Sequence, residues 1–279
     1  MLSKLIGHEF KATRRIFLPA YGVVLILSIL NGIFMALPSN LDHITMPFGV
    51  LLTVYILAMF AICVLTFAYM ISRFYKNLLG DEGYLMFTLP ARPSELIWAK
   101  CMTSTLWILL TAIVCCISLF ILVVPAMITA IPAGGSFILD GTHVSLIQYL
   151  FHIVREIWNI YGVHMILMPL VFILIALIWI ANFCMHIYAC LSIGSLANKH
   201  RLGFSFLAYL GFGVLSEILL MIFATVSDAF PTITFDLPSL SDIAQIYLTI
   251  LVIAIYYLIK LGVNFVISNY ILSKHLNLQ

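Results

Sequence analysis

The stretch VHMILMPLVFILIALIWIANFCMHIYACLSIGSL, from Val163 to Leu196, decides the fold of this chain. It is 34 residues long and contains no aspartate, glutamate, lysine or arginine. A helix needs about 20 mostly apolar residues to cross a hydrocarbon core roughly 30 Å thick. The stretch therefore predicts a membrane-spanning helix, and its extra length predicts that this helix tilts or protrudes from the membrane.

Five more stretches pass the same test of length and apolar character. They cover residues 18–37, 47–71, 101–128, 206–226 and 243–267, so the sequence predicts an all-α integral membrane protein with six transmembrane helices. The composition agrees, because 64% of the 279 residues are apolar and 9% are charged, against about 45–50% and about 25% in soluble domains. These values exclude a soluble domain, a disordered chain and a nucleic-acid-binding protein, and the net charge of +2 gives no reason to expect a polyanionic partner.

The basic residues set the predicted orientation. Eleven of the 13 lysines and arginines lie before the first span, between spans two and three, between spans four and five, or after the last span. Arg155 lies on the opposite side, and Lys260 lies within the last span. Because segments rich in lysine and arginine stay in the cytoplasm, we predict a multi-pass protein of the cell (cytoplasmic) membrane with both termini cytoplasmic.

Residues 1–17 predict an amphipathic N-terminal helix. Apolar side chains fall on one side of it at helical spacing, and Lys4, Lys11, Arg14 and Arg15 fall on the other. This pattern is typical of a helix that lies in the membrane interface and is attracted by anionic lipid head groups. The alternative is an ordinary basic flank that only sets the topology.

Three charged residues lie where a charge is costly. Glu9 projects from the middle of the apolar side of the N-terminal helix, so we predict a basic partner for it, with Arg73 or Lys76 as the candidates. Glu217 and Lys260 lie within spans five and six at similar depths, and we predict an intramembrane charged pair between them. The alternative is that Lys260 reaches the inner interface and Glu217 is protonated.

The loop between spans three and four predicts a second amphipathic helix, over about residues 143–161. Apolar residues from Val144 to Tyr161 repeat at helical spacing, and polar residues gather on the opposite face. We expect this helix either on the outer membrane surface or packed as a lid over the spans, two placements that spacing alone does not separate.

Residues 72–100, SRFYKNLLGDEGYLMFTLPARPSELIWAK, carry the most information between the spans. Gly80 is placed to end a helix, because glycine tolerates a left-handed terminating conformation, and the acidic residues 81–82 suit the start of a new short helix. The run over 84–89 is unusually apolar for a loop, which favours contact with a protein partner. Residues 94–95 then open the helix that continues as span three.

This loop and the N-terminal helix resemble parts of the membrane-spanning subunits of bacterial ABC exporters, the six-span permeases of the ABC-2 type superfamily. The family's first cytoplasmic loop has acidic residues and a glycine, an apolar stretch, Leu-Pro with a small residue, and a lysine that begins span three. The matching positions here are Asp81, Glu82, Gly83, Tyr84, Leu85, Phe87, Leu89, Pro90, Ala91 and Lys100. The sequence EFKATRR at 9–15 is similar to the family's interfacial elbow helix. The chain departs from many family members in having its longer outer loop between spans three and four.

The resemblance implies an elbow helix at 1–17 and a six-helix permease domain at 18–279. It implies that the short helix over 81–88 couples the chain to a separate ATP-binding subunit, which carries ATP and Mg. The chain has no G-x-x-x-x-G-K-[ST] phosphate loop, so the ATPase would be another polypeptide. A second permease subunit, identical or a sister chain, would complete the path for an amphipathic substrate such as a peptide, an antibiotic or a lipid-like molecule. We expect the partners to be these subunits and the lipid bilayer, and no catalytic, cofactor or metal site in this chain.

Two other functions stay open at this point. One is an intramembrane protease or lipid-modifying enzyme, although no H-E-x-x-H, paired-glutamate or G-x-S-x-G arrangement occurs. The other is a membrane immunity or scaffold protein that works without ATP. The apolar, acid-capped loop helix favours the transport subunit, because an enzyme would not need it there.

Overall fold

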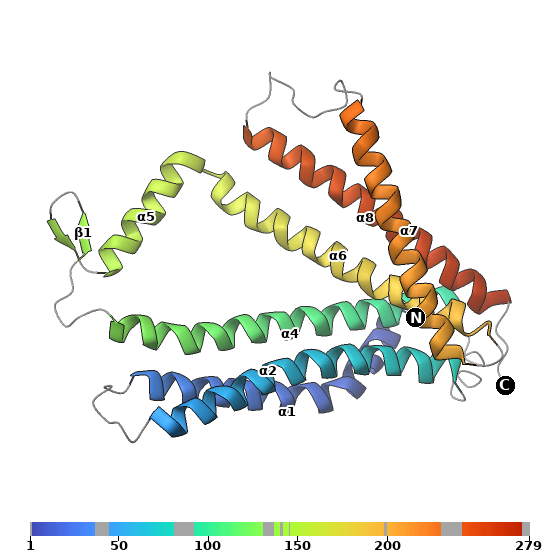
Figure 1. Cartoon of the computed structure of the whole chain (residues 1–279), viewed down its shortest axis with the longest axis horizontal. Coiled ribbons are helices and arrows are strands. Elements are labelled where there is room, and N and C mark those ends of the chain that lie inside the picture. Colours follow the sequence, from blue (N-terminus) through green and yellow to red (C-terminus); the bar gives the residue numbers. More distant parts are fainter. Residues whose placement is uncertain are drawn as a thin grey trace. The chain divides into compact units, whose positions relative to one another are not determined.

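Among the residues that the structure describes, six helices are long and apolar enough to cross a membrane, which confirms the six predicted spans and indicates a multi-pass membrane protein. The computed structural model (Figure 1) describes residues 2–36, 45–80, 92–130, 137–139, 142–144, 146–197, 200–229 and 242–274. The six long helices are α1 (Leu2–Ala36), α2 (Thr45–Phe74), α4 (Pro93–Ala130), α6 (His164–Gly194), α7 (Arg201–Ala229) and α8 (Asp242–Lys274).

Several helices extend beyond the predicted spans. Helix α4 begins at Pro93, next to the helix start predicted at residues 94–95 and ahead of the span predicted from residue 101, and the carbonyl of Arg92 accepts a hydrogen bond from the amide of Glu95 at 2.9 Å. Proline suits the first turn of a helix because it has no amide hydrogen to leave unpaired there. Helix α1 is continuous from Leu2, so the predicted interfacial segment 1–17 runs without a break into the first span.

The segment between α4 and α6 contains a β-hairpin and a further helix. Strands β1 (Phe137–Leu139) and β2 (Thr142–Val144) pair antiparallel, with Phe137 opposite Val144. The predicted outer helix exists as α5 (Leu146–Tyr161), but the prediction was wrong to include Val144, which belongs to the strand. Most of the described apolar side chains of α5 are exposed, including Phe151 at 73% and Trp158 at 47%.

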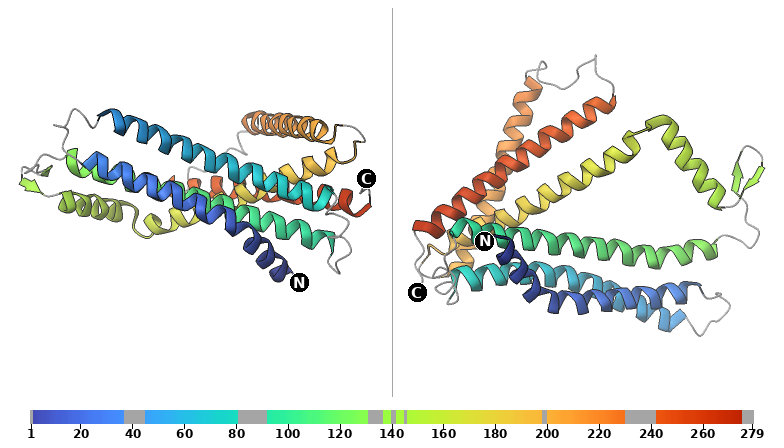
Figure 2. Two further views of the ribbon diagram at one scale, coloured as in Figure 1. Left: turned by 90° about the horizontal axis from the view of Figure 1, so that it is seen from below. Right: turned by 180° about the vertical axis from the view of Figure 1, so that it is seen from behind.

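The chain divides into two compact units. Unit 1 comprises Met1–Thr13, Phe67–Ile108 and Ile175–Gln279, and unit 2 comprises Arg14–Thr66 and Leu109–Leu174. In unit 2, segments of α1, α2 and α4 run side by side (Figure 2) and are joined by hydroxyl groups. Thr111 on α4 lies 2.9 Å from Tyr21 on α1 and 3.0 Å from Thr66 on α2. Such polar contacts hold spanning helices together, because burial of apolar surface gives little advantage within lipid.

Unit 1 is built around the C-terminal part of α6, whose residues 184–192 are buried on all sides. Small residues there, such as Ala189 and Ser192, let neighbouring helices approach closely. The Tyr188 ring stacks on Phe74 at the end of α2, with ring centres 4.0 Å apart. The Tyr188 hydroxyl also meets the Ser104 hydroxyl on α4. One side chain of α6 therefore joins the end of α2 to the start of α4.

Candidate functional site

The principal site is a buried ionic cluster that we call the Glu9 cluster: Glu9 of α1, Arg73 of α2 and Lys100 of α4. Arg73 Nε donates to Glu9 Oε2 at 2.5 Å, and Lys100 Nζ donates to Glu9 Oε1 at 3.0 Å. Arg73 Nη1 also donates to the Tyr69 hydroxyl at 3.0 Å. Both carboxylate oxygens of Glu9 thus have a cationic partner, which makes these charge-assisted hydrogen bonds stronger than neutral ones.

The cluster is enclosed by packed side chains. Glu9 is 7% exposed and Lys100 is 4% exposed. One turn further along α1, Thr13 accepts a hydrogen bond from the Trp107 indole at 2.7 Å, and Phe10 stacks on the Trp107 ring at 4.7 Å. The N-terminal helix is therefore fixed to α4 by a ring contact and a hydrogen bond as well as by charge.

The prediction that Glu9 takes a basic partner is confirmed, and Arg73 is that partner. The other candidate, Lys76, is exposed and makes no ion pair among the described residues. Sequence reasoning missed Lys100 as the second partner. A signal was present, because Lys100 lies on the buried stripe of α4 at helical spacing from Leu96 and Thr103.

The other predicted residues of the elbow helix are on its surface. Lys11, Arg14 and Arg15 are exposed, on the side of the helix opposite the buried Glu9, Thr13 and Phe17. This arrangement agrees with the predicted two-sided character of residues 1–17.

The predicted coupling residues Asp81, Glu82, Gly83, Tyr84, Leu85, Phe87, Leu89 and Pro90 lie outside the described residues. The chain enters this loop through a π-helix, η2 (Tyr75–Leu79), which directly continues α2. The helix ends at Gly80 as expected, but the expected reason was wrong, because Gly80 has φ −99° and is not left-handed. Close approach favours glycine instead, because a Cβ at Gly80 would lie 3.0 Å from the Lys76 carbonyl oxygen.

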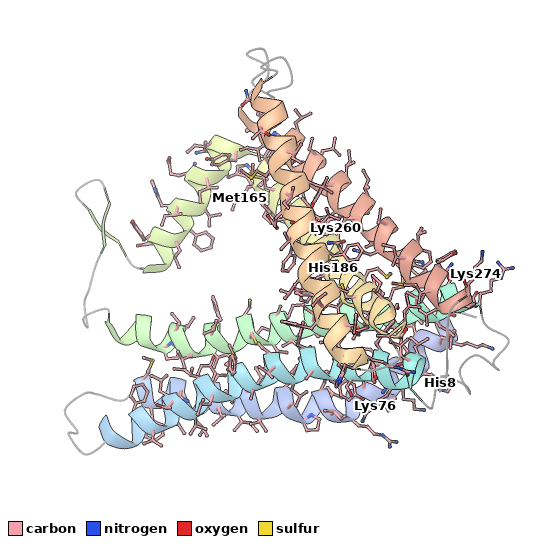
Figure 3. The ribbon with its side chains drawn as sticks, turned by 45° about the vertical axis from the view of Figure 1, so that its right-hand side comes forward. His8, Lys76, Met165, His186, Lys260 and Lys274 are labelled. Atoms are coloured by element: carbon pink, nitrogen blue, oxygen red, sulfur yellow. The ribbon has the colours of Figure 1, made fainter. Side chains whose placement is uncertain are left out.

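A second site is a cavity of about 540 Å³ between α6, α7 and α8, which we call the α6–α8 cavity. Glu217 of α7 and Lys260 of α8 both line it. They do not form the predicted ion pair, since the ion pairs among the described residues are those of Glu9. Figure 3 shows Lys260 next to His186, which lies on the buried part of α6.

Two buried polar atoms at this cavity lack a hydrogen-bond partner. They are Asn182 Oδ1 and His186 Nδ1, on residues that line the cavity one helical turn apart on α6. A buried polar group left unpaired costs about 1–3 kcal/mol of stability. These two atoms have almost no accessible surface, so they lie behind the cavity wall, whereas Glu217 and Lys260 are the charged groups that line it.

Among the described residues, no group of three or more histidine, cysteine, aspartate or glutamate side chains could hold a metal ion. Comparisons with known protein families, curated proteins and solved structures find no match to this chain. The functional argument therefore depends on the two sites and on the sequence motifs.

Proposed function

We propose that this chain is the permease subunit of an ATP-driven exporter of the ABC-2 type, working with a separate ATP-binding subunit. Six helices long and apolar enough to cross a membrane support a transport protein. The observation that carries the proposal is the Glu9 cluster, because it joins the two motif-bearing segments of the sequence. Glu9 belongs to the elbow-like sequence, and Lys100 is the lysine that closes the loop motif.

The Glu9 cluster links the two helices that flank the loop at 81–91. Arg73 precedes this loop on α2, Lys100 follows it on α4, and both bind the same carboxylate. A force applied to the loop by an ATPase would therefore reach both helices and the N-terminal helix together. A motor-driven subunit needs such a connection, because a loosely attached loop would move without moving the spans.

In this proposal both termini and the loop at 81–91 are cytoplasmic, and the apolar residues at 84–89 enter a groove on the ATP-binding subunit. ATP and Mg stay on that partner. Two permease subunits, identical or sister chains, form the path for an amphipathic substrate. This chain has no catalytic role of its own.

Purification from the native membrane in a gentle detergent tests the proposal. We expect an ATPase to co-purify with the unaltered chain and to be lost when Asp81 and Glu82 are both changed to lysine. Glu156→Lys, which reverses an exposed carboxylate on α5, is the matched control and should keep the ATPase. If the unaltered chain comes alone even after crosslinking, the proposal fails and a screen for enzymatic activity should follow.

A further inference from the structure

The α6–α8 cavity has no part in the coupling described above, yet it has the features of a ligand site. Its volume of about 540 Å³ lies within the range of about 300–1,000 Å³ usual for small-molecule sites. Three helices contribute polar lining groups: Asn182 and His186 from α6, Ser216 and Glu217 from α7, and Lys260 from α8. All of them belong to unit 1.

The cavity is lined by one acidic and one basic side chain that do not form an ion pair with each other. Glu217 and Lys260 line the same space, and neither is in an ion pair among the described residues. Ionisable side chains within a membrane are costly unless they pair with each other or face a polar occupant. Since these two residues share a cavity without pairing, the space between them suits an occupant that carries a charge of each sign.

The polar side chains of this cavity differ in how far a ligand can reach them. Glu217 is exposed and Lys260 is partly exposed, so both can meet a molecule in the cavity. Asn182 and His186 are 5% and 8% exposed, and their Oδ1 and Nδ1 atoms have almost no accessible surface, so we assign no ligand contact to these atoms. A ligand ammonium group has three donors, which suit the two oxygens of the Glu217 carboxylate.

Aromatic side chains supply the apolar part of the wall. Trp179 and Phe183 stack with ring centres 6.1 Å apart, and both line the cavity together with Tyr257. Such rings accommodate an apolar body, and their faces also attract a cation. The cavity thus combines two opposite charges with an apolar surface.

We infer that the α6–α8 cavity binds a zwitterionic amphiphile, with the ammonium of the ligand at Glu217, its anionic group at Lys260, and its apolar body against Trp179 and Phe183. A ligand with a single charge would leave either Glu217 or Lys260 unpaired. The same chemistry occurs in phosphatidylethanolamine, which comes from the bilayer, and in a short apolar peptide with free termini, which comes from water. The inference does not depend on the proposed function, because the site lies within one chain.

Native mass spectrometry of the purified, delipidated full chain tests the inference. Phosphatidylethanolamine is compared with phosphatidylglycerol, and trileucine with its N-acetylated, amidated form. We expect at least one zwitterionic probe to be retained more strongly than its counterpart. Retention of the lipid alone identifies the bilayer as the source, and retention of the peptide alone identifies a water-soluble ligand. If neither zwitterion is preferred, the inference is wrong.

Substitutions of the charged lining residues test whether the zwitterionic probe binds in the α6–α8 cavity. Glu217→Gln or Lys260→Met should weaken retention of the zwitterion about tenfold or more, the effect of losing one charge-assisted hydrogen bond. Glu156→Gln and Lys4→Met, at exposed positions, are the matched controls and should leave retention unchanged. The exchanged variant Glu217→Lys with Lys260→Glu keeps one charge of each sign and should recover binding. Equal retention by the unaltered chain and both single variants would place any bound ligand elsewhere and overturn the inference.

Discussion

The Glu9 cluster and the α6–α8 cavity place similar charges in different surroundings within unit 1. In the cluster, one carboxylate binds two cations, and the surrounding residues are packed. In the cavity, Glu217 and Lys260 line open space without forming an ion pair, and Glu217 is exposed. A satisfied buried network fixes a structure, whereas charges left unpaired at a cavity leave capacity for a ligand. The first arrangement therefore suits anchoring, and the second suits binding.

The largest expected difference between anchoring and binding is in the loss of stability when one carboxylate is removed from each region. Glu9→Gln leaves the buried Lys100 and the half-buried Arg73 without their shared anion, and breaking a buried pair in this way costs about 3–5 kcal/mol of unfolding free energy. Glu217→Gln should cost no more than about 1 kcal/mol, because its carboxylate makes no ion pair to lose. Titration of the purified chain with sodium dodecyl sulfate measures both values. Equal losses would remove the distinction between the two regions.

A substitution where the end of α6 meets the start of α7 should have an intermediate effect on the unfolding free energy. Gly194 ends α6 so close to the start of α7 that a Cβ there would lie 2.7 Å from the carbonyl oxygen of Arg201 and the amide nitrogen of Ser205. Gly194→Ala therefore forces the two helices apart, and overpacking of this kind costs about 1–3 kcal/mol.

Gly211→Ala on α7 is the matched control, since nothing lies within 4 Å of a Cβ at that position. Because alanine favours a helix over glycine, the control should leave the unfolding free energy unchanged or raise it by up to about 1 kcal/mol. The same detergent titration measures both variants. An unchanged stability of Gly194→Ala would mean that the ends of α6 and α7 separate freely.

The smallest expected effect concerns the hydrogen bond beside the Glu9 cluster. Trp107→Phe keeps the ring that stacks on Phe10 but removes the donor to Thr13. We expect a loss of about 1 kcal/mol, the usual value for one hydrogen bond. A double-mutant cycle with Thr13→Val should give a coupling of similar size. Additive losses in the cycle would mean that ring stacking alone holds the two helices together at this point.

The six spans could be predicted from sequence because hydropathy and length decide membrane insertion. Which faces of the helices pack could not, because apolar residues point to lipid and protein alike. Phe60 and Phe74 both lie on α2, yet Phe60 is 68% exposed and Phe74 is 1% exposed. Hydropathy gives the same value for both, so it does not indicate that Phe74 lies beneath Tyr188.

For the candidate sites, the positions of charged residues were more informative than hydropathy. A lone carboxylate on an apolar helix face requires a partner, which is why Arg73 could be predicted for Glu9. Lys100 was missed because it was assigned to the loop motif and not considered as a partner of Glu9, although the helix was predicted to open at residues 94–95 and Lys100 lies on the buried stripe of α4. The cavity could not be foreseen, since its lining comes from three helices whose crossing no local pattern encodes.

Because of the π-helix before the loop, the direction in which the chain leaves α2 depends on the number of residues there as well as on their type. The buried face of α2 includes Met70 and Phe74, four residues apart, and it continues into the π-helix at Leu78 and Leu79, which are both buried. A π turn holds about one residue more than an α turn, so deleting one residue within 75–79 should restore an α turn and keep the direction in which the chain leaves, whereas deleting one residue from α2 before it would rotate that direction by about 100°. A related protein with an unbroken α-helix there should align with this chain through a single-residue gap.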